Sequence, residues 1–218
     1  MPRNRPAILV TGFGPFPGAP RNASSLLAEA LAEAASRVLP GYAIHAETLP
    51  TEWQAGPSRL SALIDTLQPV VAVHFGVSHR ARSFVVETRA RNMRDDIDDA
   101  CGAAPDSVCV ADSGPAQLTA TLPTGLIVER LRRRGIPVQL SRDAGGYLCN
   151  ALLYHSLDDA RRRSRSGFGV RRGFIHIPDR LAAGRGGARR ANACLLDWNS
   201  ALEGGIEILT TSAGVGER

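Results

Sequence analysis

Short apolar runs alternate along the chain with stretches in which apolar residues recur at helical spacing. The strand-like runs lie at 7–11, 42–49, 70–75, 83–91, 136–140 and 173–177, and the helical patterns at 24–37, 53–67, 123–134, 147–161 and 188–202. This alternation predicts an α/β fold, in which three α/β/α layers surround a mostly parallel, twisted open sheet. The continuous apolar run at 70–75 is typical of a central parallel strand that is covered on both faces.

A chain of 218 residues fits a single domain, which we expect to span residues 1–218. Ser24 or Ser25 is placed to cap the first helix. Residues 92–122 are acidic and rich in Gly and Pro, without clear periodicity, so they are expected to form a lid or an excursion from the core. Residues 204–218 are ambiguous between a small strand and a loose tail.

The composition argues against a membrane or exported protein. Apolar residues make up 44% of the chain, enough for a sizeable core. No apolar run approaches the roughly 20 residues that a membrane-spanning helix needs. The first residues lack the apolar segment of a signal peptide. The sequence therefore predicts a cytoplasmic protein without membrane contact.

All 26 basic residues are arginines, and the formal net charge is +5. Such a balance permits nucleic-acid binding without arguing for it. The arginine-rich stretch at 161–172 keeps a nucleic-acid binder open as an alternative. However, aromatic residues make up only 5% of the chain and none is interleaved with arginine as a stacking surface would require. We expect no nucleic-acid partner.

Neither a metal nor a cofactor is expected. The four cysteines, Cys101, Cys109, Cys149 and Cys194, include no C-x-x-C pair and fit no zinc spacing. The acidic residues between 95 and 99 lack a calcium-loop pattern, so solvated charge is the better interpretation. The loop at 12–18 has three glycines at the wrong spacing for a dinucleotide, and its prolines remove two N–H donors.

Cys149 is the candidate nucleophile. It follows Gly145 and Gly146 and lies in the first turn of a predicted helix, after a predicted strand. Free N–H groups and the positive end of the helix dipole stabilise a thiolate there. The arrangement is similar to a nucleophile elbow with Cys in place of Ser. On spacing alone, a buried structural cysteine remains the alternative.

A thiolate nucleophile needs a histidine within reach and a group that orients the histidine. His176 ends a predicted strand, which places it at the same sheet edge as Cys149. Glu87 lies in an otherwise apolar strand and must be paired if it is buried. His155 faces away from Cys149 on the same helix, His74 is expected in the core, and His79 is expected on the surface.

The ordered motifs resemble those of the pyroglutamyl-peptidase I family, also called pyrrolidone-carboxylate peptidases, which are cysteine peptidases. The similar segments cover nearly the whole chain. They are the opening strand and loop from Ile8 to Phe16, Gly76-Val77-Ser78, Glu87 with Asn92, Asp112 to Pro115, Thr121-Leu122-Pro123, Ser141 to Asn150 and Gly173 to Pro178. Each motif alone is weak evidence, whereas their common order is strong evidence.

The resemblance implies a catalytic triad of Cys149, His176 and Glu87 that removes N-terminal pyroglutamate from peptides through a thioacyl-enzyme, without metal or cofactor. Phe13 and Phe16, on a rigid loop, would form an apolar slot for the lactam ring. Together with Val77, Tyr147 and Leu148 they are the substrate-binding candidates. Both phenylalanines could instead belong to the core.

Three positions depart from the family pattern that the resemblance implies. Val77 stands where many members have Gln, Thr88 stands where many have Arg, and Cys101 follows an Asp-Asp-Ala segment that elsewhere precedes an arginine. These departures leave the triad intact. They keep open a relative that binds cyclised N-termini or another lactam without turnover. A homo-oligomer is possible, since family members range from monomers to tetramers.

Overall fold

The structure is a computed structural model that describes residues 5–164, 169–181 and 195–215. The strands are β1 (Ala7–Phe13), β2 (Ala43–Leu49), β3 (Val71–Ser78), β4 (Phe84–Glu87), β5 (Arg89–Arg91), β6 (Gln117–Thr119), β7 (Val138–Ser141) and β8 (Arg171–Pro178). The helices are α1 (Ala23–Val38), α2 (Ala55–Leu67), α3 (Thr124–Arg133), α4 (Leu148–Ser164) and α5 (Trp198–Ser212). None of these helices is long and apolar enough to cross a membrane.

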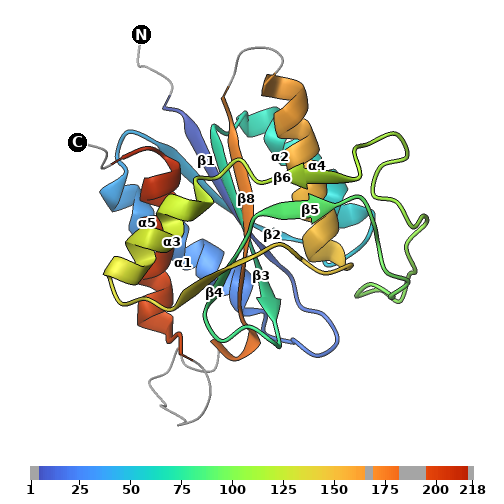
Figure 1. Cartoon of the computed structure of the whole chain (residues 1–218), viewed down its shortest axis with the longest axis horizontal. Coiled ribbons are helices and arrows are strands. Elements are labelled where there is room, and N and C mark those ends of the chain that lie inside the picture. Colours follow the sequence, from blue (N-terminus) through green and yellow to red (C-terminus); the bar gives the residue numbers. More distant parts are fainter. Residues whose placement is uncertain (1–4, 165–168, 182–194, 216–218) are drawn as a thin grey trace.

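Six strands form the main sheet in the order β2-β1-β3-β8-β4-β7. β1, β2, β3 and β8 run parallel, whereas β4 pairs with β8 in the antiparallel direction and with β7 in parallel. The prediction of a mostly parallel sheet is therefore confirmed. A second, two-stranded sheet of β5 and β6 lies beside α4 (Figure 1).

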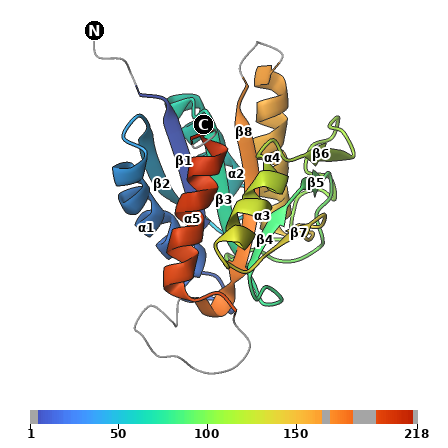
Figure 2. The same cartoon turned by 60° about the vertical axis from the view of Figure 1, so that its left-hand side comes forward.

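Helices cover both faces of the main sheet. Figures 1 and 2 show α1, α3 and α5 on one face and α2 and α4 on the other. Two separate apolar clusters fill the space between the layers, one built on β-strand residues such as Val10 and Val73, the other on Leu9, Ala72 and Phe174. Because neighbouring strand residues point to opposite faces, both layers can be buried by the same strands. The three-layer prediction is confirmed.

A fully buried histidine ties β1, β3 and the middle of α4 together. The Nδ1 atom of His74 in β3 lies 2.8 Å from the Thr11 hydroxyl in β1, and its Nε2 atom lies 2.8 Å from the Ser156 hydroxyl in α4. Burial and the nearby Arg172 charge lower the pKa of His74 to about 3. The imidazole is therefore neutral at neutral pH, and hydroxyl partners satisfy both of its nitrogens. The expectation that His74 belongs to the core is confirmed.

The C-terminal segment differs most from its prediction. The sequence pattern indicated a helix at 188–202 and a strand or loose tail after it, but α5 runs from Trp198 to Ser212. Residues 188–194 and 216–218 lie outside the described residues. The Asp197 side chain caps α5 by accepting the Ser200 N–H at 2.8 Å.

Two neighbouring glycines inside α5, Gly204 and Gly205, serve its packing. A Cβ on Gly204 would lie 2.5 Å from the Phe84 ring, and one on Gly205 would lie 2.5 Å from the Leu31 side chain. Such approaches are shorter than van der Waals contact, so only glycine lets α5 lie this close to its neighbours.

Several boundaries are also corrected. The cap of α1 is Asn22, whose side chain accepts the Ser24 N–H at 3.1 Å, so neither Ser24 nor Ser25 is the cap. β3 continues through Gly76 to Ser78, and the predicted strand at 83–91 divides into β4 and β5 around Thr88. The segment at 92–122, expected to be without regular structure, contains β6 and packs against α4 through it.

The buried His74 predicts a specific sensitivity to acid. Its folded pKa of about 3 lies below the unfolded value of 6.5, so its contribution to stability is complete above pH 6.5 and is lost as the pH falls toward 3. We expect His74→Phe to be less stable than the wild type at neutral pH, by about 2–4 kcal/mol for the stranded hydroxyls and altered packing. This gap should narrow on acidification, as measured by urea unfolding. A gap that stays constant with pH would contradict the prediction.

Candidate active site

The loop before α4 carries Cys149 to the edge of the sheet. Gly145 has a φ of 83°, and its N–H donates to the Asp143 carboxylate at 3.1 Å, which forms a tight turn. α4 begins at Leu148, so Cys149 lies in its first turn. The first N–H groups of a helix have no partner within it, and the helix dipole is positive at this end. The Asn150 and Ala151 N–H groups already donate to the Tyr147 carbonyl, at 3.0 and 3.2 Å, so the donors for a negatively charged oxygen beside Cys149 would be the N–H groups that precede them.

Asn150, next to the nucleophile candidate, fixes the start of α4 against β5. It is fully buried, its amide donates to the carbonyls of Arg91 and Met93 at 2.9 Å each, and its oxygen accepts the Arg91 N–H at 2.8 Å. The sequence pattern assigned no role to Asn150. Three hydrogen bonds from one buried amide hold the first turn of α4 at a fixed height over the sheet.

Gly76 makes room for the sulfur atom. In the strand register Gly76 of β3 lies beside His176 of β8, and His74 lies beside Phe174. A Cβ on Gly76 would be 3.0 Å from the Cys149 Sγ atom and 2.6 Å from the Phe174 ring. Any larger residue would push the sulfur or the ring away. The glycine therefore lets Cys149 lie directly on the sheet next to His176.

His176 and Glu87 meet in the buried part of the sheet. The Nδ1 atom of His176 lies 2.9 Å from the Glu87 Oε1 atom, and Glu87 is only 1% exposed. β4 runs antiparallel to β8, and this register sets Val85 opposite His176 and Glu87 opposite Phe174. The expectation that a buried Glu87 must be paired agrees with this contact. Its other oxygen, Oε2, has no hydrogen-bond partner within the described residues.

The charge state of His176 depends on its two neighbours. Burial by itself lowers the pKa of this imidazole. Two neighbours outweigh this effect and raise the pKa of His176 to about 10. Each of them, first Cys149 and then Glu87, acts through its charge and through a side-chain hydrogen bond. Since these partners are negative when ionised, they favour the imidazolium form. Cys149, His176 and Glu87 are therefore in contact as a chain of sulfur, imidazole and carboxylate.

A small cavity of about 40 Å³ opens beside the sulfur. Its lining consists of Phe13, Phe16, Asn22, Thr51, Val77, Tyr147, Leu148 and Cys149. The five residues named from the sequence as substrate-binding candidates all belong to this lining. Asn22 and Thr51 were not among those candidates. Among the described residues that line it there is no Asp, Glu, His, Lys or Arg, so apart from Cys149 the lining suits a compact, uncharged group.

Hydrogen bonds from Asn22 and Thr51 make the wall with Phe13 rigid. The Asn22 amide and the Thr51 hydroxyl each donate to the Gly14 carbonyl at 3.0 Å. The Phe13 N–H donates to the Ser24 hydroxyl at 3.0 Å. A polar residue in the N-cap position and a threonine after a strand were the only sequence signals for these two residues. The cavity is therefore largely formed before any ligand enters.

Tyr147 lines the cavity and packs against Trp53. The two rings pack edge to face with their centroids 5.2 Å apart, and the Tyr147 hydroxyl donates to the Asp98 carbonyl at 3.3 Å. Burial, with the charges of Asp99, Cys149 and Asp98, raises the pKa of Tyr147 to about 12. The phenol therefore stays neutral and acts as a hydrogen-bond donor and an apolar wall.

The acidic segment at 95–99 is only partly solvated, which corrects its interpretation as solvated charge. Asp95, Asp96 and Asp98 are exposed, but Asp99 is 7% exposed and accepts N–H groups from Trp53, Cys101 and Ala103 at 2.9–3.0 Å. These hydrogen bonds lower the pKa of Asp99, against the opposing effect of its burial. Asp99 thus fastens the loop beside the cavity. Within the described residues, no group of three His, Cys, Asp or Glu side chains could hold a metal ion.

The remaining candidates lie away from the cavity. His79 is exposed, as expected, and its ring lies 2.7 Å from the Asp179 carboxylate. Cys101 is exposed and Cys109 is half-buried, and neither lines the cavity, while Cys194 lies outside the described residues.

The arginine-rich stretch is largely compensated by acidic groups. Arg161 and Arg162 pair with Asp158, and Arg163 pairs with Asp159. Arg172 has no exposed surface.

Residues 6–183 match the family model described as pyroglutamyl peptidase. The chain belongs to the pyroglutamyl peptidase family. This membership makes it a hydrolase of the cysteine-peptidase type, as the ordered motifs implied.

Curated relatives and solved structures agree with the family. The chain is 36% identical over 172 residues to a pyrrolidone-carboxylate peptidase of Chromobacterium violaceum, covering 78% of this chain and 77% of that protein. It is 37% identical over 175 residues to one of Gloeobacter violaceus, covering 78% and 80%.

Two solved structures share the fold. Pyroglutamyl peptidase I of Bacillus amyloliquefaciens has a TM-score of 0.81 at 27% identity, with 96% of this chain and 97% of that chain covered. A mutant pyrrolidone carboxyl peptidase from Pyrococcus furiosus has a TM-score of 0.81 at 25% identity, with 95% and 98% covered. The α/β fold described above is thus the family fold.

Gly76→Ala tests whether the sulfur needs the space left by this glycine. We expect a folded protein, destabilised by about 1–3 kcal/mol through overpacking. Displacement of the sulfur should slow both alkylation of Cys149 by iodoacetamide and hydrolysis of a pyroglutamyl substrate, the latter on the order of 10²-fold. The matched control is Gly125→Ala on α3, where a Cβ meets no atom within 4 Å. Wild-type rates in Gly76→Ala would show that the sulfur has room to spare.

The pKa of His176 should depend on Cys149. Removing the sulfur in Cys149→Ala deletes its charge and its hydrogen bond, and leaves burial opposed by Glu87 alone. We therefore expect the pKa of His176 to fall from about 10, as followed by NMR titration of the labelled imidazole. Cys109→Ala, at a half-buried cysteine outside the cavity, should leave this titration unchanged. An unaltered His176 titration in Cys149→Ala would mean that the two side chains are not coupled.

Proposed function

We propose that this protein removes N-terminal pyroglutamate from peptides by nucleophilic catalysis, with Cys149 as nucleophile, His176 as acid and base, and Glu87 as the group that orients His176. The observation that carries the proposal is the contact chain from the Cys149 sulfur through His176 to Glu87, placed beside a small uncharged cavity. Family membership supports the reaction class.

Acylation begins with the Cys149 thiolate attacking the carbonyl carbon of the pyroglutamyl residue. The carbonyl π electrons move to oxygen, and the N–H groups at the very start of α4, before Asn150, would stabilise the resulting oxyanion. The imidazolium of His176 then gives its Nε2 proton to the leaving amine as the C–N bond breaks. The products of this step are a thioester on Cys149, a free peptide amine and a neutral imidazole.

In deacylation the same groups act again, but His176 now accepts a proton first. Neutral His176 accepts a proton from water, and the hydroxide equivalent attacks the thioester carbonyl. The C–S bond breaks, pyroglutamic acid leaves, and the thiolate–imidazolium pair is restored. Glu87 accepts the Nδ1–H of His176 throughout, which keeps the Nε2 atom directed toward the reacting atoms.

Specificity follows from what the cavity lacks. Pyroglutamate is a lactam and carries no charged amino group, so its ring can enter an uncharged cavity between Phe13, Phe16 and Tyr147. An ordinary peptide N-terminus is an ammonium ion, and no carboxylate among the lining residues would pair with it. Burial of an unpaired charge is strongly unfavourable, so such substrates are excluded.

The same proposal includes a reducing compartment, which the cytoplasm provides. Cys101, Cys109 and Cys149 are free thiols. A catalytic thiolate is lost when it is oxidised, so the reaction requires conditions that keep Cys149 reduced.

A cleavage assay tests the function. The purified, reduced protein is given a pyroglutamyl-aminocoumarin substrate, and prolyl-aminocoumarin serves as the charged five-membered-ring counterpart. We expect release of the fluorophore from the first and none from the second. Cys149→Ser should lower kcat/KM by about 10³-fold or more, and Glu87→Gln should lower it on the order of 10²-fold.

The matched control is Cys109→Ser, which lies outside the cavity and should retain the wild-type rate. Folding of each variant is checked by its thermal unfolding. Absence of turnover by the folded, reduced wild type would contradict the proposed function, and full activity in Cys149→Ser would contradict the role of the sulfur.

A further inference from the structure

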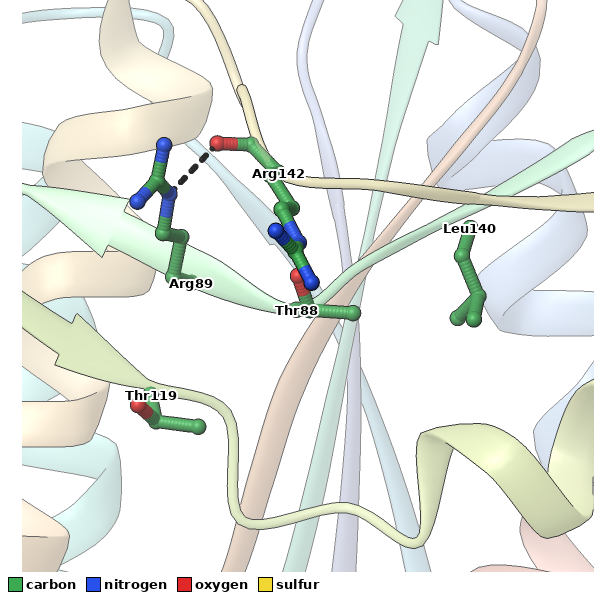
Figure 3. A pocket seen from close by; sticks show the side chains of 5 residues that line it. All are labelled: Thr88, Arg89, Thr119, Leu140 and Arg142. Atoms are coloured by element: carbon green, nitrogen blue, oxygen red, sulfur yellow. Dashed lines mark hydrogen bonds between the residues drawn. The ribbon is translucent and has the colours of Figure 1, made fainter.

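A second and larger cavity, of about 550 Å³, lies at the β7 edge of the main sheet. Thr88, Arg89, Thr119, Leu140 and Arg142 line it, as Figure 3 shows. It shares no lining residue with the cavity beside Cys149. The proposed reaction uses none of these five side chains, so this cavity needs its own explanation.

The two arginines give this cavity a positive charge. No carboxylate belongs to the lining, and in the described part of the chain neither Arg89 nor Arg142 forms an ion pair. Neighbouring arginines behave differently, because Arg91 pairs with Asp143 at 2.7 Å and Arg94 pairs with Asp106. An anion bound between Arg89 and Arg142 would supply the missing partner.

The Arg89 guanidinium is already held in place. Its Nε atom donates to the Arg142 carbonyl at 2.8 Å, and its Nη1 atom donates to the Gln117 side chain at 2.8 Å. Figure 3 shows the Arg142 side chain extending toward Thr88 across the same space. A guanidinium fixed by two hydrogen bonds loses little freedom when it binds a ligand, which favours affinity.

The rest of the lining is apolar or neutral. Leu140 is 49% exposed although it lies on a strand, and within the described residues β7 is the edge strand, paired with β4 alone. A cavity of this size matches those that bind small organic molecules. The charged end of such a ligand would face the arginines, and its apolar part would cover Leu140.

We propose that this cavity binds a small organic oxyanion, a phosphate or a carboxylate attached to an apolar group, with its charged end between Arg89 and Arg142. The site is independent of the proposed peptidase reaction, because the two cavities have separate linings.

Calorimetric titration of the full chain tests the site. Cys149 is first alkylated with iodoacetamide, so that binding in the cavity beside Cys149 does not contribute to the measured heat. The probes are phenyl phosphate, benzoate and neutral benzamide. We expect one or both anions to bind at least about tenfold more tightly than benzamide, with an affinity that falls as salt is added. The anion that binds with the lower Kd shows whether the site prefers a phosphate or a carboxylate.

Charge-neutralising variants locate the binding. Arg142→Gln removes a guanidinium without a bonding partner in the described residues, so it should fold normally and weaken anion binding by about tenfold or more. Arg89→Gln should do the same, although it also loses two hydrogen bonds. Arg37→Gln is the matched control, since Arg37 is an exposed arginine on α1 that pairs with Glu33.

Three outcomes would overturn the proposal. The first is that neither anion binds in a saturable way up to millimolar concentrations. The second is that benzamide binds as tightly as the anions. The third is that the two variants do not differ in anion affinity, either because Arg142→Gln keeps the wild-type affinity or because Arg37→Gln loses as much affinity as Arg142→Gln. This result would mean that the anions are attracted by the net positive charge of the protein and not by this cavity.

Discussion

The contact between the first turn of α4 and the sheet at Gly76 is the constraint on which the site depends. The sulfur of Cys149 can lie beside His176 only because β3 has no side chain at that position. Asn150 fixes the start of α4, and the hydrogen bond between His74 and Ser156 fixes the middle of the helix to β3. Several buried polar interactions therefore converge on the position of one atom, as expected where a reactive group must be held to within a fraction of an ångström.

Two buried histidines on adjacent strands show that partners, rather than burial, decide the charge of an imidazole. His74 has hydroxyl partners and a positive neighbour, and its pKa falls to about 3. His176 is buried as well, but a sulfur and a carboxylate raise its pKa to about 10. By linkage, the stability that His176 contributes is complete below pH 6.5 and is lost as the pH rises toward 10. The contribution of His74 is lost on the acid side, so the two groups bound the stable range from opposite directions.

Local patterns predicted what depends on local order. The apolar run at 70–75 identified the central strand, and a carboxylate within an apolar strand identified Glu87 as a residue in need of a partner. Periodicity does not encode strand direction. It therefore could not predict that β4 and β7 run antiparallel to the other strands of the sheet. Likewise, the predicted position of α5 was wrong. Gly204 and Gly205 lie inside this helix because they make close contacts with Phe84 and Leu31, which are far away in the sequence. Asn22 and Thr51 reach the cavity from separate segments, and only the folded chain brings them together.

Two of the departures from the family pattern have different physical meanings in this fold. The N–H and hydroxyl of Thr88 both donate to the Ser141 carbonyl, at 2.8 and 2.7 Å, which joins β4 to the segment leading toward Cys149. Thr88 therefore acts in the scaffold and in the lining of the larger cavity. Val77 lines the small cavity itself and makes its wall more apolar than an amide would. The polar side chains in this lining are then those of Asn22, Thr51 and Tyr147, together with the Cys149 sulfur. If the proposed function holds, an apolar Val77 wall favours the uncharged lactam ring over a charged N-terminus.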